Sequence, residues 1–253
     1  MKVINKIFWD TDKISMITNH LDADTHSHLM LQLFVGIDDY VEIIINDIRI
    51  KCDVIIVNEK MLHILFRQRG NCIFLRLLTQ TSVYGKKLID KMGKRDFLIY
   101  DPIDTYELSR QVKRLLHNTN VEQYKHFYKY LLNYLELSMY KHTYDERISN
   151  IFQILDTCKC TDHSIKYLAD NVFLSSSRLS HLFKEQTGIP LKSYIILHQM
   201  ERAFDELFAG KNITESSMIA GFDSPSHFAS TVKKMMGMTV SLSLKDSEFL
   251  KVY

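Results

Sequence analysis

Three histidines in the first quarter of the chain could form a binding or metal site. His26 and His28 are separated by one residue, and His63 follows further along the chain. Side chains two positions apart on a β-strand point to the same face, so these two rings could meet the third inside a small barrel. Imidazole is a common metal ligand. The run from residue 25 to residue 32 holds no Asp or Glu to complete a metal site, so we expect ligand binding or polar packing instead.

A second group of metal-binding residue types consists of Cys158, Cys160 and His163. One residue between the cysteines is not the two- to four-residue spacing of zinc sites. Cysteines this close at a helix end are also strained for a disulfide, so we expect buried thiols. The remaining cysteines are Cys52 and Cys72. Because the chain opens without an export signal, we expect reduced thiols and a cytoplasmic protein.

Motifs for catalysis and for membrane insertion are missing from the sequence. It has no glycine-rich phosphate loop, nucleophile elbow or His-Glu-x-x-His motif, so we expect no enzyme and no cofactor. The apolar runs Ile43–Ile45 and Val54–Val57 are too short to span a bilayer. Apolar residues make up 46% and charged residues 25%, which indicates a globular protein. With a net charge of only +2, any nucleic-acid surface must be a local patch.

The elements that would position these residues change type along the chain. Up to about residue 80, short runs of Ile, Val, Leu and Phe alternate with turn residues, which predicts a barrel or sandwich. The predicted strands are Leu29–Val35, Val41–Ile45, Ile48–Val57, Leu62–Arg67 and Cys72–Leu78. Helical spacing then predicts helices at Ser82–Met92, Thr105–Leu116 and Val121–Tyr140. The last helix has apolar residues outside a single stripe, which indicates partners within the chain or in a second subunit.

From about Glu146 onward the sequence predicts short helices, and one pattern occurs twice. In each copy a short helix, a tight turn and a second helix follow one another, and the second helix opens with Ser and ends at Gly. The spacing from Leu179 to Gly188 equals that from Phe228 to Gly237. The predicted helices are Ser164–Ala169 and Ser176–Gln186, then Pro190–Phe208 as a connection, then Thr214–Ala220 and Ser224–Met236.

This duplicated pattern is typical of a helix-turn-helix. Two helices that cross steeply need a small residue at the crossing, and Ala169 and Ser217 stand there in the two copies. The second helix of each copy would bury one face and present the other to a major groove. The residues expected to point inward are Leu179, Leu182 and Phe183 in the first copy and Phe228 and Val232 in the second.

From Glu146 to about Leu244 the chain resembles the AraC/XylS family of transcription regulators. The matching residues are Leu168-Ala169 with Ser177–Gly188 in the first copy, and Gly221–Ser224 with Lys233 and Gly237 in the second. The pair Ser216-Ser217 departs from the family's usual Ile-Ala. The N-terminal half resembles the cupin-like sensor barrel that precedes such domains. There, histidines such as His26, His28 and His63 often serve a ligand without a metal.

The resemblance and the helical phase together indicate which residues would contact DNA. They are Ser177, Arg178, Ser180, His181 and Lys184 in the first copy and Ser226, His227, Ser230, Lys233 and Lys234 in the second. The serines and histidines would face base edges, and Arg178 and the lysines would face phosphates. No residue facing the bases is an Arg or Asn, so specificity would depend on DNA shape and water. The alternative for each residue is an ordinary solvated helix face.

These observations predict an α+β protein with two domains. Residues 1–145 would sense a signal and dimerise, and residues 146–253 would bind double-stranded DNA. The expected function is a sequence-specific transcription regulator, a homodimer that responds to a small-molecule effector by changing promoter occupancy or RNA polymerase contact. Residues 146–253 hold 12 basic and 12 acidic residues, so non-specific binding should be weak. This neutrality leaves open an interaction protein that acts without DNA, and the histidines leave open a metal-dependent cupin enzyme.

Overall fold

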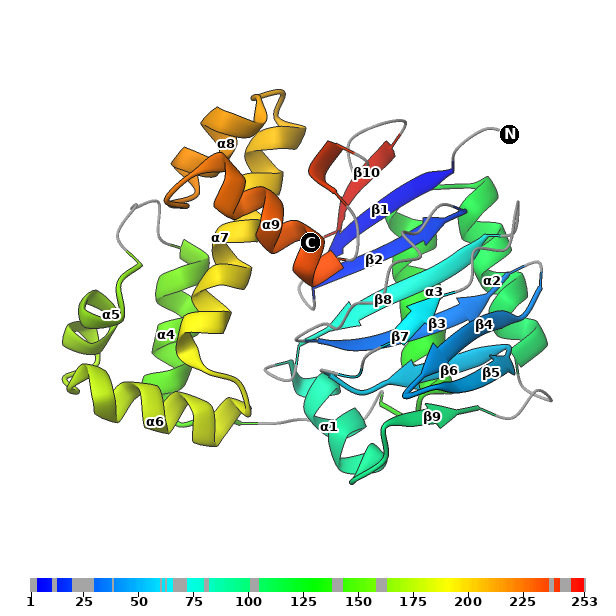
Figure 1. The fold of residues 1–253 in the computed structure, drawn as a ribbon, viewed down its shortest axis with the longest axis horizontal. Helices are drawn as coiled ribbons and strands as arrows, with labels where there is room; N and C mark the ends of the chain where they lie inside the picture. Colours follow the sequence, from blue (N-terminus) through cyan, green and yellow to red (C-terminus); the bar gives the residue numbers. More distant parts are fainter. Residues whose placement is uncertain are drawn as a thin grey trace. The chain divides into compact units, whose positions relative to one another are not determined.

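The computed structural model describes residues 4–10, 13–19, 30–37, 39–59, 61, 63–65, 72–79, 82–100, 105–137, 143–157, 163–236, 239–241 and 247–252. The chain divides into two compact units, Met1–Tyr140 with Lys233–Tyr253 and Lys141–Val232. The first unit is rich in β-structure and the second is helical, which confirms the predicted α+β class (Figure 1). None of the helices in these ranges is long and apolar enough to cross a membrane.

The strands of the first unit form two sheets. They are β1 (Asn5–Asp10), β2 (Lys13–Thr18), β3 (Leu31–Gly36), β4 (Val41–Ile45), β5 (Ile48–Cys52), β6 (Val54–Val57), β7 (His63–Leu65), β8 (Ile73–Leu78), β9 (Phe97–Ile99) and β10 (Ser247–Val252). The larger sheet has the order β10-β1-β2-β8-β3-β6-β9, and the smaller has the order β5-β4-β7. Among the described residues these strands form two separate sheets and not the single closed barrel that was one of the predicted architectures.

The predicted strands are found, with one division. The run Ile48–Val57 forms β5 and β6 rather than one strand, because β5 pairs with β4 in the smaller sheet and β6 pairs with β3 in the larger one. The chain passes between the sheets at Asp53, whose backbone oxygen accepts a hydrogen bond from Gly36 (2.8 Å). Strands β1, β2, β9 and β10 were not predicted. Cys52 and Cys72 are buried and free, and burial, with the nearby Asp53, raises the pKa of Cys52 to about 12.

The C-terminal strand β10 joins the N-terminal sheet. It runs parallel to β1, with Asn5 opposite Ser247 and Asp10 opposite Val252. The Nζ of Lys6 lies 2.9 Å from a carboxylate oxygen of Glu248, which fixes the same register. The sequence-based division placed residues 233–253 in the DNA-binding domain. By their contacts these residues group with the first unit, in which β10 pairs with the edge strand β1.

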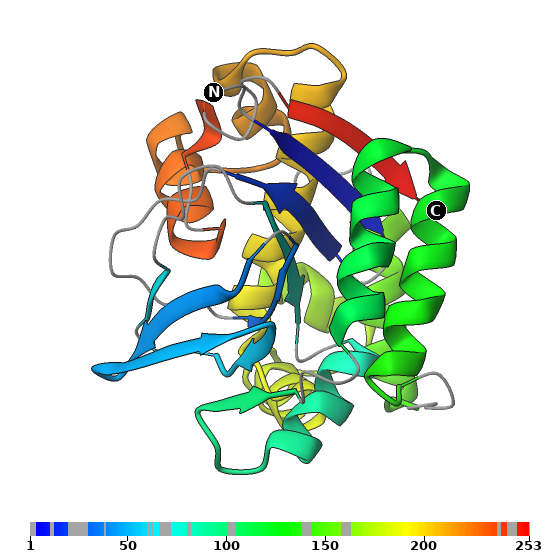
Figure 2. The same cartoon turned by 90° about the vertical axis from the view of Figure 1, so that its right-hand side faces the viewer.

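Three helices pack on the larger sheet. They are α1 (Val83–Met92), α2 (Thr105–His117) and α3 (Val121–Tyr134), and α3 ends six residues before its predicted end at residue 140. Helices α2 and α3 lie side by side on one face of the sheet, and α1 lies at its lower end (Figure 2). The side chains of Tyr124, Phe127 and Leu131 on α3 are buried against the sheet. Its exposed residues are Glu122, Lys125, His126, Lys129 and Asn133, all polar. The extra apolar surface of this helix is therefore largely covered within its own unit.

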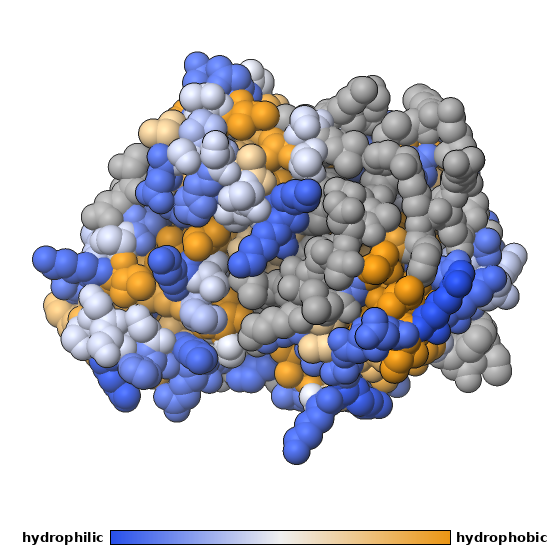
Figure 3. All heavy atoms as spheres, in the orientation of Figure 1, coloured by the Kyte–Doolittle hydropathy of each residue, from blue (hydrophilic) through white to orange (hydrophobic). Residues whose placement is uncertain are grey.

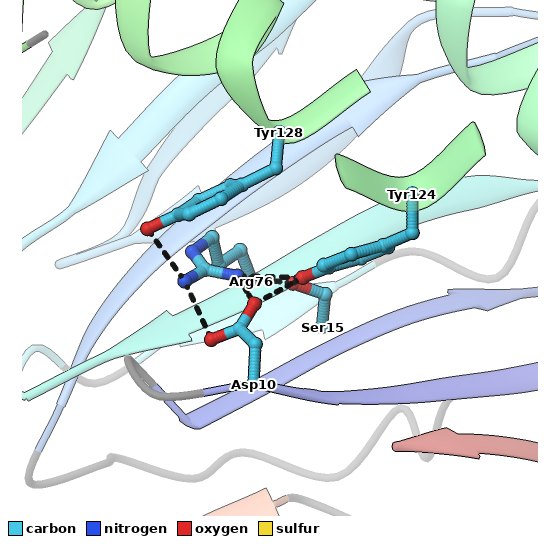
Figure 4. A network of polar contacts seen from close by, with 5 residues as sticks. All are labelled: Asp10, Ser15, Arg76, Tyr124 and Tyr128. Carbon is cyan, nitrogen blue, oxygen red and sulfur yellow. Dashed lines mark hydrogen bonds and ion pairs between the residues drawn. The ribbon is translucent and has the colours of Figure 1, made fainter. Parts of the chain in front are cut away.

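A buried ion pair lies within the sheet, between Asp10 on β1 and Arg76 on β8, and two tyrosines of α3 are hydrogen-bonded to it (Figure 4). The Arg76 guanidinium donates two hydrogen bonds to the Asp10 carboxylate, at 2.8 and 3.1 Å, and the exposed fractions of these side chains are 1% and 5%. Arg76 also donates to Ser15 (2.6 Å), to the Tyr124 hydroxyl (2.9 Å) and to the Tyr128 hydroxyl (3.1 Å). The Tyr124 hydroxyl donates to Asp10. Charge and hydrogen bonds are therefore matched within one cluster on β1, β2, β8 and α3.

The ionisation of this cluster follows from its neighbours. Burial acts to lower the pKa of Arg76, but Asp10, Tyr124 and Tyr128 together raise it well above its usual value. Burial raises the pKa of Tyr124, so its hydroxyl keeps its proton and can donate to the carboxylate. The Tyr128 ring covers the guanidinium, with 4.4 Å between the Arg76 Cζ and the ring centroid. Arg76 is consequently a permanent buried cation that requires Asp10.

The second unit is helical and follows the predicted pattern closely. Its helices are α4 (Glu146–Thr157), α5 (Ile165–Asn171), α6 (Ser176–Thr187), α7 (Leu191–Phe208) and α8 (Ile213–Ile219), and α9 (Pro225–Met236) begins in it. Asp145 precedes α4, and hydrogen bonds from Arg147 lower the pKa of its carboxyl to about 2. On α8 both serines of the Ser216-Ser217 pair are fully buried. Ser217 donates to the backbone oxygen of Thr214 (2.9 Å), whereas the Ser216 hydroxyl has no hydrogen-bond partner among the described residues.

Replacing Asp10 with Ala should destabilise the first unit by about 3–5 kcal/mol, because the buried Arg76 cation loses its counter-ion. Trp9 is the only tryptophan of the chain and lies beside Asp10, so its fluorescence during urea unfolding reports on this unit. The double variant Asp10→Leu/Arg76→Met should be more stable than Asp10→Ala, since no charge remains buried. A loss below about 1 kcal/mol for Asp10→Ala would show that the pair behaves like a surface ion pair.

Replacing Ser216 with Ala should stabilise the second unit by about 1–3 kcal/mol, because a buried hydroxyl without a partner is removed. The matched control is Ser217→Ala, which removes a hydroxyl that is hydrogen-bonded and should give no such gain. Hydrogen exchange of the α8 amides and calorimetry of the full chain would measure both effects. Equal stability of the two variants would contradict the assignment of an unsatisfied hydroxyl to Ser216.

Candidate nucleic-acid interface

Two helix pairs in the C-terminal region have the same construction. In the first pair, Ser164 caps α5 and Ser175 caps α6, each through a hydrogen bond from the backbone N–H three residues later. In the second, Asn212 caps α8 and exchanges hydrogen bonds with Glu215 as a capping box. The helix α7 connects the pairs. The chain therefore contains two helix-turn-helix units at the predicted positions.

The two turns share a hydrogen bond and a left-handed residue. In the first turn the N–H of Leu174 donates to the oxygen of Ala169 (3.0 Å), and in the second the N–H of Phe222 donates to the oxygen of Ser217 (3.0 Å). The residue before each of these amides has a positive φ, 55° at Phe173 and 86° at Gly221. Ala169 and Ser217 are buried at the crossings, as predicted.

The inner faces of the second helices are fixed by aromatic contacts. On α6, Phe183 lies 5.7 Å from the ring of Phe152 on α4 and 5.4 Å from Tyr194 on α7. On α9, Phe228 lies 5.8 Å from Phe204 on α7. The predicted inward residues Leu179, Leu182, Phe183, Phe228 and Val232 are all buried. Because these faces are occupied, only the opposite faces of α6 and α9 can meet a ligand.

The outer face of α6 carries small polar and basic side chains. Ser177, Arg178, His181 and Lys184 are exposed, and Ser180 is half-buried. The Ser180 hydroxyl donates to the oxygen of Ser176 (2.7 Å), so its remaining capacity toward a partner is as an acceptor. In Figure 3 the surface over α6, at the lower left, is mostly blue, the colour of hydrophilic side chains, and white, the middle of the hydropathy scale. Within the described residues neither Arg178 nor Lys184 forms an ion pair, so both cations are available for phosphates.

The outer face of α9 differs from that of α6 in its histidine. Ser226, Ser230, Lys233 and Lys234 are exposed, as the helical phase predicts. His227 is half-buried instead, with its Nδ1 3.3 Å from the Asp223 carboxylate and its ring 5.3 Å from that of Phe222. The ring of this histidine is therefore packed against the turn, while the two lysines extend from the last turn of the helix.

Of the three histidines predicted to meet in the first unit, only His63 lies within the described residues. His63 is buried, with its Nδ1 2.9 Å from the backbone oxygen of Met61 and its ring 6.2 Å from Phe34. His26 and His28 lie outside the described residues, as do Cys158 and Cys160. In the second unit His163 is buried against the ring of His198, 5.1 Å away. Among the described residues no three His, Cys, Asp or Glu side chains are grouped to hold a metal ion.

One surface cavity in the first unit was not foreseen from the sequence. It has a volume of about 420 Å³ and lies where the ends of β3 and β5 meet the start of α2. Its lining includes the acidic Asp39 and Asp53 and the basic Arg110 and Lys113. Thr105, at the first position of α2, donates to Asp53 (3.0 Å) at the cavity wall. Only the fold brings these segments together, so local sequence patterns carry no signal for it.

Comparison with known proteins supports both halves of this description. Residues 168–245 match the family model of the helix-turn-helix domain. No curated protein matches the chain at a significant level. Among solved structures, ToxT from Vibrio cholerae is 12% identical, with 95% of this chain and 96% of that chain covered and a TM-score of 0.54. ToxT from strain O395 bound to (E)-4-(8-methylnaphthalen-1-yl)but-3-enoic acid is 13% identical, with 95% and 97% covered and a TM-score of 0.52.

A third structure, ToxT from strain SCE256 with a bound unsaturated fatty acid, is 13% identical, with 94% and 91% covered and a TM-score of 0.50. At these identities the likeness concerns the fold, which extends over nearly the whole chain. The match at residues 168–245 and the duplicated helix pairs confirm the predicted resemblance. Residues 168–245 carry a helix-turn-helix domain of the AraC type, and this supports a DNA-binding transcription regulator of the AraC/XylS type.

Proposed function

We propose that the chain binds a promoter by placing α6 and α9 in major grooves and that its first unit controls this binding in response to a signal. The observation that carries the proposal is the opposite character of the two faces of each helix. The inner faces are buried by aromatic contacts, and the outer faces carry short polar side chains followed by lysines. Short polar residues admit a helix deep into a groove, and lysines at its edge neutralise phosphates.

The length of α7 suggests the spacing of the two contacts. The helix has 18 residues, which corresponds to about 27 Å. Major grooves on one side of DNA recur about every 34 Å. We therefore propose two half-sites about one helical turn apart on the same side of the duplex.

Roles on α6 follow from chemistry and exposure. Ser177, Ser180 and His181 would contact base edges, and Arg178 and Lys184 would contact phosphates. On α9 the corresponding base contacts would come from Ser226, His227 and Ser230, and the phosphate contacts from Lys233 and Lys234. Because the His227 ring is half-buried against Phe222, we propose that the second helix-turn-helix unit reads bases less than the first.

The first unit is the proposed sensor. Three similar solved structures are ToxT, two of them with small organic ligands bound, and this supports a small-molecule effector for the present chain. The described cavity beside α2 has a volume in the usual range for such ligands, about 300–1,000 Å³. A lining that includes two acidic and two basic side chains would suit a small polar effector. The buried His63 ring contacts the backbone oxygen of Met61 through its Nδ1 and packs against Phe34, which supports a structural role for His63.

Self-association and polymerase contact remain proposals. A homodimer through the Val121–Tyr140 segment was predicted from its apolar surface. The exposed face of α3 is polar, so any dimer would have to use another surface or the residues beyond its end. A regulator that acts without DNA is the second candidate, and the balanced charge of residues 146–253 is what favours it. Sequencing of genomic fragments bound to the purified protein would separate the two functions.

Replacing His181 with Ala should weaken binding to the preferred site by about 1–3 kcal/mol and change the sequence preference there. Replacing Lys184 with Ala should weaken binding to all sequences alike and reduce the salt dependence, because one phosphate contact is lost. Titrations of specific and random duplexes at two salt concentrations would measure both. An equal loss on specific and random DNA for both variants would contradict the division of roles on α6.

The first helix-turn-helix unit should contribute more specific affinity than the second. The matched variants are Ser180→Ala/His181→Ala on α6 and Ser226→Ala/His227→Ala on α9, compared on the same operator at the same salt. The α6 pair should cause the larger loss, because His181 is exposed whereas His227 is half-buried against Phe222. A loss from the α9 pair that equals or exceeds that from the α6 pair would make this ranking wrong.

A further inference from the structure

The turn of the first helix-turn-helix unit exposes a strained phenylalanine. Phe173, between α5 and α6, is 95% exposed, the largest value among the exposed large hydrophobic residues of the described structure. Its φ of 55° is in the left-handed region, which bulky side chains rarely adopt. An aromatic ring in water gains no burial, and its backbone is unfavourable, so Phe173 contributes nothing evident to the fold.

The second helix-turn-helix unit shows which residue this turn position favours when only the fold matters. Its left-handed turn residue is Gly221, which directly precedes the Phe222 amide that donates to the Ser217 oxygen. Phe173 has the same place in the first helix-turn-helix unit, directly before the Leu174 amide. Glycine adopts positive φ without a steric penalty. The same turn is therefore built once with the residue that suits its backbone and once with a residue that does not. Strained positions of this kind concentrate at functional sites.

We propose that Phe173 is a DNA contact that reads thymine methyl groups beside the bases met by α6. The inference rests on the proposed insertion of α6 into a major groove. Phe173 precedes Ser177 by four residues, so their Cα atoms lie within about 14 Å, comparable to the width of the major groove at about 12 Å. Phenylalanine is one of the side chains that make apolar contact with the C5 methyl of thymine.

The surroundings of Phe173 favour a base over a phosphate. From residue 170 to residue 177 there is no Lys or Arg, and Asp170 at the end of α5 is exposed and acidic. This turn therefore offers no cation to a phosphate. The residues that lead into α6, Ser175 to Ser177, are small serines, which leave the ring of Phe173 uncovered. An apolar group at this place adds discrimination that the serines and His181 cannot supply.

The test uses the full chain and an operator selected from bound genomic fragments. Each thymine of the operator is replaced in turn by deoxyuridine, which lacks only the methyl group. For the natural protein, at least one replacement should weaken binding about fourfold, the effect of burying one methyl group. Phe173→Gly should bind the natural operator more weakly and lose the response to that replacement. Phe173→Leu, which keeps an apolar side chain, should retain part of it.

Stability separates a lost contact from a damaged fold. Phe173→Gly installs the residue found at the matching turn, so its thermal unfolding should occur at the same or a higher temperature than that of the natural protein. If Phe173→Gly binds the operator as tightly as the natural protein and keeps the same deoxyuridine profile, the proposed contact is wrong. Unchanged binding with lost promoter activity would instead assign Phe173 to a protein partner. If the natural protein binds no genomic fragment, the proposed function itself fails.

Discussion

The buried pair of Arg76 and Asp10 is the constraint on which the first unit depends. A guanidinium taken out of water is tolerated only when its charge and its donors are matched, and here Asp10, Ser15 and two tyrosines of α3 supply the match. These partners come from β1, β2 and α3, so the cluster fixes the N-terminal hairpin and the last helix of the layer relative to β8. The bidentate ion pair fixes β1 relative to β8. The hydroxyls of Tyr124 and Tyr128, hydrogen-bonded to the same guanidinium, fix the position of α3 on the sheet, which apolar packing alone would leave free to slide.

The position of β1 has a consequence for the C-terminal end of the chain. β1 would be an edge strand without β10, and an unpaired edge is a surface for unwanted association. β10 covers it and is itself attached, through residues 237–246, to α9. The second reading helix is therefore linked covalently to the proposed sensor at its C-terminal end as well as through the rest of its unit. A change at the β1 edge of the sheet has a direct chain connection to α9, and the proposed control of DNA binding needs such a connection.

Sequence patterns predicted the elements whose burial is decided locally. The bounds of α5, α6, α8 and α9 agree to within about two residues, because caps at Ser164, Ser175 and Asn212 and the spacing of Leu and Phe determine them. The strands β1 and β2 were missed because their polar residues Asp10 and Ser15 read as surface positions. Their burial makes sense only beside Arg76, which lies more than sixty residues away. β10 was missed for a related reason, since nothing in its own sequence specifies a partner strand at the other end of the chain.

The candidate interface also has a part that could be predicted from local sequence and a part that could not. The outward residues of α6 and α9 follow from helical phase, and the structure agrees except where a neighbour intervenes, as Phe222 does at His227. Each helix-turn-helix unit also contains one residue that its local structure disfavours, and this residue is buried in one unit and exposed in the other. The second helix-turn-helix unit buries the hydroxyl of Ser216 within its packing. The first helix-turn-helix unit exposes its irregular residue, Phe173, on the surface just before the N-terminal end of α6. A defect in the interior weakens the unit that contains it, but an unfavourable residue on the surface leaves the packing intact and remains available to a partner. This difference supports the first helix-turn-helix unit as the one that reads the DNA sequence. It supports the second helix-turn-helix unit as the one whose position the rest of the chain can shift.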